Sequence, residues 1–256
     1  MRVFRSEPFF DKLQAFLASL YRKQYGFLGW EAKPGETPRT ATLRSTVIEM
    51  MGVAGDASVR EQAMEFFHDL TGPDPGRTVP GDLQKVIFKL ALQYDEATVC
   101  STLKAIYESV DGSPEEKRNC LTTMGSVVDP TRHIEMMDYV LFSGKVRLQD
   151  MAFPLSALAT TSDERGKATW AYLRDHFESL RAKYADGPMW GSIVGLSCRG
   201  LTQTSEADEV EAFFEGRTGS ATRRLSQALE IVRTRAQRRN RDRHAIQRFL
   251  EQSMST

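Results

Sequence analysis

Hydrophobic residues recur at helical spacing along this chain, and residues 113–150 show the pattern most fully. Ser113 is a favourable N-cap, Pro114 suits the first position of a helix, and Glu116 stands where a capping-box carboxylate reaches back. The apolar face of this helix consists of Cys120, Leu121, Met124, Val127 and Val128. Because one amphipathic helix cannot bury its stripe alone, we expect helical neighbours on both sides.

Two further helices follow within the same stretch. Asp129 and Pro130 end the first helix and begin the second, and Gly144 ends the second. The apolar face of the second helix is Ile134, Met137, Val140 and Leu141, and the third stripe is Leu148, Met151, Leu155 and Leu158. Pro154 lies inside the third pattern, so we expect a kink or a late helix start there.

The same spacing predicts helices throughout the N-terminal part of the chain. Their inward residues are Phe10, Leu13, Leu17, Leu20 and Tyr21 in residues 7–25; Leu43, Val47, Met50 and Met51 after Thr37-Pro38; Val59, Ala63, Phe66, Phe67 and Leu70 after Gly55 and the cap Asp56; Leu83, Val86, Ile87, Leu90 and Ala91; and Val99, Leu103, Ile106 and Val110 after the cap Asp95. Trp30 is expected to be buried where it closes a turn. Residues 71–81, with three prolines and three glycines, predict a surface excursion.

Helical spacing also dominates the C-terminal part. The predicted elements are one long helix over residues 162–184 with Trp170, Leu173, Phe177, Leu180 and Tyr184 inward; a break at Asp186-Gly187-Pro188; a small-residue helix over 189–201; a short helix capped by Ser205 and Asp208 and ending at Gly216; and a last helix over 220–250 with Leu225, Leu229, Val232 and Ala236 on one side.

About a dozen helices and no convincing strand indicate an all-α protein. Helix pairs recur at roughly 30 to 40 residues, a period typical of helical repeats. The prediction is therefore a curved HEAT/armadillo-like α-solenoid of stacked antiparallel helix pairs without a significant sheet.

Composition is that of an ordinary globular protein, with 41% hydrophobic and 27% charged residues. No apolar run is long enough to cross a bilayer, and charged residues interrupt the apolar positions of residues 1–20, so no membrane partner or secretory signal is expected. The three cysteines are Cys100, Cys120 and Cys198; they are widely spaced, lie in predicted helices and read as free buried thiols. A reducing compartment, with the cytoplasm as the default, follows.

The formal charge is +0 overall, but residues 217–248 hold ten arginines and no lysine against two acids, a local charge of +8. Four interpretations stay open for this arginine-rich helix: a solvated face, an intramolecular contact with the acidic remainder, nucleic-acid binding, and capture of a peptide carboxylate by arginine forks. The last makes Arg223 and Arg224 candidate residues for contacting a peptide or partner.

Catalytic motifs are missing from the sequence. There is no H-E-x-x-H zinc helix, no Walker loop, no G-x-G-x-x-G and no G-x-S-x-G, so we assign no catalytic residue, no metal ligand and no cofactor to this chain. Arg147, Gln149 and Asp150 follow a glycine turn at the start of a helix. A local cap is the simpler interpretation of these residues, and contact with a peptide or partner is the functional one.

An ordered series of short motifs runs through the chain. It consists of Leu28-Gly29-Trp30, Leu43-Arg44, Gly55-Asp56 before Phe66-Phe67, Gly125 with Asp129-Pro130, Arg147-x-Gln149-Asp150, the stretch from Trp170 to Tyr184, Phe213-Phe214, the arginine-rich helix, and Phe249-Leu250. In order and spacing the chain resembles the helical C-terminal domain of the gluzincin zinc aminopeptidases, the group of puromycin-sensitive aminopeptidase, the endoplasmic-reticulum aminopeptidases and aminopeptidase N.

The resemblance implies a role without chemistry of its own. In that family the zinc and the catalytic motifs lie in an earlier domain, and the helical bowl caps that domain and encloses the peptide chamber. The first helices of the family's domain are not matched here, so residues 1–256 are expected to be a single helical domain that is N-terminally truncated relative to the family. Its expected partners are a zinc aminopeptidase catalytic domain, in cis or in trans, and peptide substrates.

Three functional hypotheses follow, in decreasing order. The first is the noncatalytic lid or chamber domain of a zinc aminopeptidase. The second is a free-standing helical-repeat scaffold that binds a peptide or a protein. The third is a nucleic-acid binder that uses the arginine-rich helix; this ranks last because aromatic side chains for base stacking are almost absent there.

Overall fold

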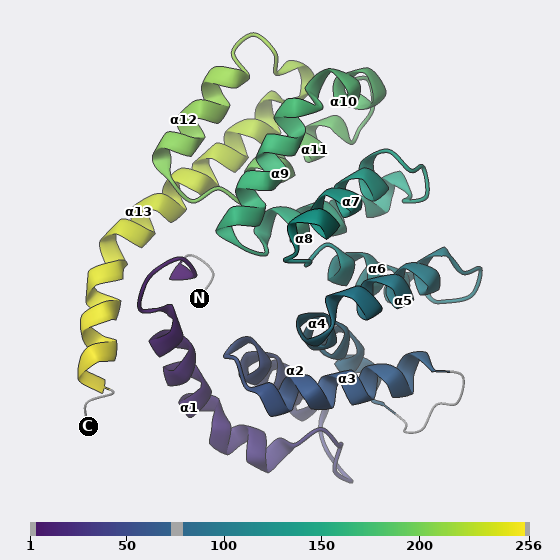
Figure 1. The fold of residues 1–256 in the computed structure, drawn as a ribbon, viewed down its shortest axis with the longest axis vertical. Helices are drawn as coiled ribbons and strands as arrows, with labels where there is room; N and C mark the ends of the chain where they lie inside the picture. Colours follow the sequence, from purple (N-terminus) through teal and green to yellow (C-terminus); the bar gives the residue numbers. More distant parts are fainter. Residues whose placement is uncertain (1–3, 73–78, 254–256) are drawn as a thin grey trace. The chain divides into compact units, whose positions relative to one another are not determined.

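The structure is a computed structural model that describes residues 4–72 and 79–253, and over these residues the fold is all-α, as the sequence predicts. No strand occurs among them (Figure 1). The α-helices are α1 (Phe10–Leu28), α2 (Pro38–Val53), α3 (Ala57–Thr71), α4 (Gln84–Tyr94), α5 (Glu96–Glu108), α6 (Pro114–Met124), α7 (Pro130–Leu141), α8 (Ala152–Thr160), α9 (Asp163–Asp175), α10 (Phe177–Tyr184), α11 (Trp190–Cys198), α12 (Thr204–Phe213) and α13 (Thr222–Ser253). Short 3₁₀ turns η2 (Gly81–Leu83), η3 (Leu148–Asp150) and η4 (Gly219–Ala221) precede α4, α8 and α13.

The chain divides into two compact units. The α1–α6 unit comprises Pro8–Thr123 with Arg248–Thr256, and the α7–α13 unit comprises Met1–Glu7 with Met124–Gln247. The segment before α1 thus belongs to the same unit as the helices that follow α6. That a single helical domain covers residues 1–256 stays a prediction.

Helices that are consecutive in sequence pack on one another in the α1–α6 unit. Helix α1 packs on α2, α3 packs on α2 and α4, and α4 packs on α5 (Figure 1). The predicted caps are in place, because the side chains of Thr37, Asp56, Asp95 and Ser113 each accept a backbone N–H from the first turn of the next helix. Short-range sequence signals therefore set where these helices begin.

The buried face of the first helices differs from the prediction. Leu20 and Leu43 are exposed rather than inward, and Val110 lies beyond the end of α5 with 97% of its surface exposed. In α2 the inward position next to Leu43 is taken by Arg44, which is 1% exposed. Its guanidinium pairs with Glu36, so the charge is compensated inside the unit and the apolar Leu43 turns outward.

Trp30 is buried, as predicted. Its ring stacks on Phe66 with centroids 4.9 Å apart, and its Nε1 donates to the Tyr25 hydroxyl at 3.0 Å. The turn is thereby fixed against α3. The surface excursion predicted over residues 71–81 falls mainly on 73–78, which lie outside the described residues.

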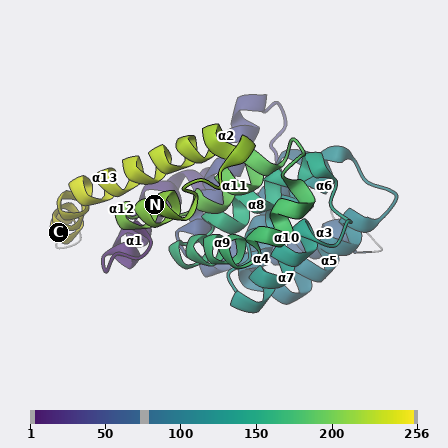
Figure 2. The same ribbon diagram turned by 90° about the horizontal axis from the view of Figure 1, so that it is seen from above.

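The α7–α13 unit is built around three helices in mutual contact. Helix α8 packs on α9, α11 packs on both, and α7 packs on α8 and α9 (Figures 1 and 2). Close approach requires glycine: a Cβ added at Gly200 would lie 1.7 Å from the carbonyl oxygen of Ala159 and 2.7 Å from the Cα of Gly166. Here the backbones pack directly on one another.

Residues 162–184 form two helices, so the prediction of one long helix is wrong. The backbone leaves the helical region at His176, with φ −106° and ψ 16°. The His176 ring stacks on Tyr172 at a centroid distance of 4.1 Å, and its Nδ1 lies 3.0 Å from the Tyr172 carbonyl oxygen. The imidazole covers the end of α9 and α10 starts in a new direction.

Two further predictions in this unit need correction. Helix α12 begins at Thr204 with a capping box of Gln203 and Glu206, not with Ser205 and Asp208 as caps. Three positions assigned to apolar faces are exposed instead, namely Val128, Ile134 and Leu148. In α7 the inward position beside Ile134 is taken by His133, whose Nε2 lies 3.1 Å from the Thr169 hydroxyl on α9.

Three other expectations for this unit are confirmed. Helix α8 begins late, at Ala152, and places Pro154 in its first turn. Asp129 caps α7 through the Arg132 N–H, and the apolar stripe of α13 is buried. Packing of sequential neighbours in each unit agrees with stacked helix pairs, while a curved HEAT-like array stays a prediction.

Candidate functional site

Arg147, Gln149 and Asp150, the first predicted contact residues, lie at η3 between α7 and α8. Asp150 is 5% exposed and its Oδ2 accepts from Arg147 Nε at 2.9 Å, whereas Arg147 and Gln149 are exposed. The Asp150 carboxylate thus has a local partner three residues away. Arg147 and Gln149 are the members of this group that could meet another molecule.

Arg223 and Arg224, the second predicted group, stand in the first turn of α13 and are both exposed. Within the described residues neither guanidinium has an ion-pair partner. The stem of Arg224 lies on α11, where a Cβ added at Gly191 would be 3.1 Å from Arg224 Cγ. The structure therefore places the two predicted groups on different elements, one at η3 and one at the start of α13.

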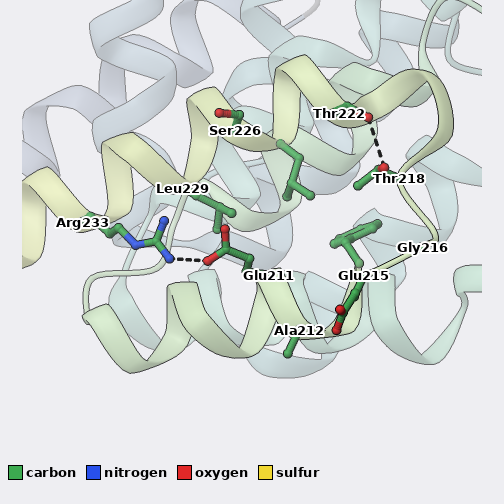
Figure 3. Close-up of a pocket in the computed structure, with 11 residues that line it drawn as sticks. Glu211, Ala212, Glu215, Gly216, Thr218, Thr222, Ser226, Leu229 and Arg233 are labelled. Atoms are coloured by element: carbon green, nitrogen blue, oxygen red, sulfur yellow. Dashed lines mark hydrogen bonds and ion pairs between the residues drawn. The ribbon is translucent and has the colours of Figure 1, made fainter.

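A concave feature of the α7–α13 unit lies between α12 and the first half of α13 (Figure 3). Helix α12 ends at Phe213, and Phe213 and the next residue, Phe214, pack into an aromatic cluster with Trp170 and Phe177. After α12 the chain turns through Gly216 at φ 70° and then enters η4, so α13 runs back past α12. The packing of Phe213 and Phe214 in this cluster, the aromatic anchor of α12, and the turn at Gly216 together leave a gap between the two helices.

This gap, the α12–α13 groove, has a volume of about 570 Å³. Buried Phe214, Leu225 and Leu229 supply its apolar surface. Its polar groups are the carboxylates of Glu211 and Glu215, the hydroxyls of Thr218, Thr222 and Ser226, and the guanidinium of Arg233. A size of about 300–1,000 Å³ and an apolar floor with a few polar groups are typical of ligand sites.

Arg233 and Glu211 close one end of the groove (Figure 3). Arg233 Nη2 lies 2.5 Å from Glu211 Oε2 and 3.0 Å from Asp208 Oδ1, so one arginine of α13 links two carboxylates of α12. These hydrogen bonds, that with Glu211 first and that with Asp208 second, raise the pKa of the Arg233 guanidinium above its ordinary value. At the opposite end the Thr222 hydroxyl donates to Thr218 at 3.1 Å.

A second arginine of α13 is held more deeply within the unit. Arg239 Nε lies 2.7 Å from Glu7 Oε1, its Nη2 donates to Ser6 at 2.8 Å, and its Nη1 lies 3.7 Å from Asp163 Oδ2. The side chains of Arg239, Glu7 and Asp163 are 17%, 9% and 10% exposed. Arg233 and Arg239 therefore make the intramolecular contacts with acidic residues that were one of the four interpretations of the arginine-rich helix.

Within residues 4–72 and 79–253, no group of three or more His, Cys, Asp or Glu is placed to hold a metal ion. Burial raises the pKa of the Cys120 thiol to about 12 and raises that of Cys198 as well, which keeps both thiols protonated at neutral pH. In the described part of the chain the three cysteines form no disulfide, and no described helix is long and apolar enough to span a bilayer.

The groove and the two arginine clusters were not found by sequence reasoning. The local charge of +8 marked the helix that carries Arg233 and Arg239, but not their partners. Phe213-Phe214 marked the end of α12 without indicating a gap beside it. The partners come from α12, α9 and the segment before α1, and no local spacing connects these with α13.

Comparisons with known proteins agree on one family. The ERAP1-like C-terminal domain family matches residues 1–234. "Aminopeptidase 2, mitochondrial" of Saccharomyces cerevisiae is 26% identical over 245 residues, covering 95% of this chain and 25% of the relative. "Aminopeptidase M1" of Arabidopsis thaliana is 26% identical over 228 residues, covering 88% of this chain and 25% of the relative. "Alanine/arginine aminopeptidase" of Saccharomyces cerevisiae is 22% identical over 253 residues, covering 98% of this chain and 29% of the relative.

The chain therefore spans about a quarter of the length of the curated relatives it matches. The resemblance inferred from the motif series, from Leu28-Gly29-Trp30 through the arginine-rich helix, is confirmed by a family match over most of the chain. This protein belongs to the ERAP1-like C-terminal domain family, the C-terminal domains of aminopeptidases.

Proposed function

We propose that this chain acts as the noncatalytic C-terminal helical domain of a zinc aminopeptidase, capping the catalytic domain and walling the chamber that receives peptides. The family match over residues 1–234 carries this proposal. Support also comes from the relatives, each named an aminopeptidase and matched over about a quarter of its length. The zinc and its chemistry would belong to the partner domain.

Association with a catalytic domain tests the proposal. The partner is the yeast relative "Aminopeptidase 2, mitochondrial", produced without the region matched by this chain, and binding is measured by calorimetry. We expect a complex, and faster hydrolysis of a nine-residue peptide than by the catalytic portion alone. Absence of both at tens of micromolar would overturn the cap and chamber role.

The predicted contact residues give a sharper version of this test. The double variant Arg223→Ala/Arg224→Ala removes two exposed guanidinium groups that have no ion-pair partner in the described residues. If they contact the catalytic domain or its peptide, the variant associates about tenfold more weakly. Arg243→Ala, another exposed arginine of α13, is the matched control, and equal losses in both variants would exclude a specific role. Arg147→Ala and Gln149→Ala test η3 in the same way.

Turnover by the chain alone is the complementary measurement. We expect no hydrolysis of aminoacyl-nitroanilides above buffer, with or without added zinc. Hydrolysis that a chelator abolishes would contradict a noncatalytic domain.

A free-standing peptide- or protein-binding scaffold is the second candidate. The α12–α13 groove favours it, because the groove is a preformed concave site within the chain itself. Binding partners that are not aminopeptidases, recovered with the intact chain and lost on groove substitution, would favour this candidate over the first.

A cytoplasmic location forms part of the proposal. The three cysteines form no disulfide in the described residues, and Cys120 and Cys198 are buried, which fits a reducing compartment. Fractionation of cells that produce the chain tests it, and enrichment in a membrane-enclosed fraction would contradict it.

A further inference from the structure

The α12–α13 groove holds polar atoms that have no partner among the described residues. Glu211 uses Oε2 for Arg233, and its other carboxylate oxygen points toward α13 (Figure 3). The Ser226 hydroxyl and the Glu215 carboxylate, which also line the groove, are unpaired in the described part of the chain. These groups stand beside the buried side chains of Leu225 and Leu229.

Charge in the groove favours a cation. Among the described residues that line it, the cation is Arg233, which is already shared between Asp208 and Glu211, and Glu215 adds a further carboxylate. Glu215 lies two residues beyond Phe213, the last residue of α12, near the helix end where the dipole contributes negative potential. An incoming anion would meet this surplus, whereas an ammonium or guanidinium would be attracted to it.

The shape of the groove and its hydroxyl and apolar groups favour a polypeptide as the ligand. The floor of Phe214, Leu225 and Leu229 accepts an aliphatic side chain, and the hydroxyls of Thr218 and Ser226 can hydrogen-bond to a peptide backbone. A volume of about 570 Å³ suits a few residues rather than a folded element.

We propose that the α12–α13 groove binds an extended internal segment of a partner protein in which a lysine or arginine stands beside an aliphatic residue. The aliphatic side chain packs on the leucine floor, and the cation approaches the open oxygen of Glu211 and the Glu215 carboxylate. This proposal is independent of the chamber role, because the groove and its lining lie within one unit of the chain and binding requires no catalytic domain.

The test uses the full chain and a peptide probe with both ends blocked, acetyl-Gly-Leu-Lys-Leu-Lys-Gly-amide, labelled with fluorescein through an added cysteine. Binding is followed by fluorescence anisotropy at low and at physiological salt. We expect saturable binding that weakens with salt, and no binding of the same peptide with glutamate in place of lysine.

Ser226→Trp fills the groove from an exposed rim position and should weaken binding about tenfold or more. Gln227→Trp, at the next and also exposed position of α13, is the matched control and should leave binding unchanged. Glu215→Gln should weaken binding about threefold and flatten the salt dependence.

Three results would overturn the proposal. These are failure of the lysine probe to bind at about 1 mM, equal binding by the Ser226→Trp and Gln227→Trp variants, and binding only of a probe with a free terminus. Should Ser226→Trp fail to fold by circular dichroism, Glu215→Lys decides: it reverses the charge on a surface position, and unchanged binding of the lysine probe contradicts the proposal.

Discussion

Arg239 Nε lies 2.7 Å from Glu7 Oε1, although the two residues are 232 positions apart in the chain. The contact fastens the segment before α1 to the middle of α13, and Ser6 donates to Asp163 Oδ2 at 2.9 Å beside it. Because Glu7 and Arg239 belong to the same compact unit, this cluster is part of what makes the first residues a member of the α7–α13 unit.

Arg239→Ala should therefore destabilise the α7–α13 unit. Removing one partner leaves the carboxylates of Glu7 and Asp163, each about nine-tenths buried, without their cation. We expect the free energy of unfolding, measured in urea, to fall by about 3 kcal/mol. We also expect faster hydrogen exchange of the backbone amides in the segment before α1.

The exposed Arg243→Ala is the control and should change the stability by about 0.5 kcal/mol or less. A double-mutant cycle with Glu7→Gln should give a coupling energy above about 1 kcal/mol. A coupling near zero would show that the contact contributes nothing to folding.

The buried His133 should make the protein less stable as the pH falls. Thr169 donates to the Arg165 carbonyl oxygen at 2.7 Å, so its oxygen accepts from His133 Nε2–H, and the buried Nδ1 carries a lone pair with no hydrogen-bond partner in the described residues. Burial, with a smaller contribution from Arg165, lowers the pKa of His133 to about 4 from an ordinary value of 6.5.

Between pH 6.5 and about 4 the unfolded chain binds a proton at this histidine that the folded chain does not. The free energy of unfolding therefore decreases by about 3 kcal/mol as the pH is lowered across that range. His133→Asn should remove this part of the pH dependence, measured as urea unfolding from pH 7 to pH 4. His68→Asn, at an exposed position, should keep it. Parallel curves for wild type and His133→Asn would contradict the assignment.

Helix starts could be predicted from sequence because they depend on neighbouring residues. The side chains of Thr37, Asp56, Asp95 and Asp129 each accept the backbone N–H of the residue three positions further on. Helix faces were less predictable, because a polar residue is buried when a partner outside its own helix compensates it. Arg44, paired with Glu36, and His133, in contact with Thr169, are inside, while the neighbouring Leu43 and Ile134 are exposed.

The candidate site was beyond sequence reasoning for a related reason. Arg223 and Arg224 were selected from a run of arginines, yet the structure gives partners to Arg233 and Arg239 in the same run. Composition gives the charge of a helix, but the fold decides which guanidinium groups meet a carboxylate. A groove between α12 and α13 likewise depends on the angle set by the turn at Gly216 and the aromatic anchor of Phe214.

Thiol accessibility should differ among the three cysteines. Cys100 is partly exposed, whereas Cys120 and Cys198 are buried with raised pKa values. With an aromatic disulfide reagent at pH 8 we expect Cys100 to be the first to react, and Cys120 and Cys198 to react only after unfolding in guanidinium. The Cys100→Ser variant isolates the buried pair, and rapid labelling of that variant in the native state would contradict the packing of α6 and α11.

Gly200→Ala tests the backbone contact at the centre of the α7–α13 unit. An added Cβ would lie 1.7 Å from the carbonyl oxygen of Ala159, a backbone atom that cannot rotate away, so α8 and α9 would have to separate from the turn after α11. We expect a loss of about 3 kcal/mol or more, seen as a lower urea midpoint.

Gly26→Ala provides the opposite case. Nothing lies within 4 Å of a Cβ added at Gly26, and the residue is inside α1. Because alanine has the higher helix propensity, this variant should gain about 0.5–1 kcal/mol. Similar stability for both variants would mean that α8, α9 and the turn at Gly200 do not approach as closely as the structure shows.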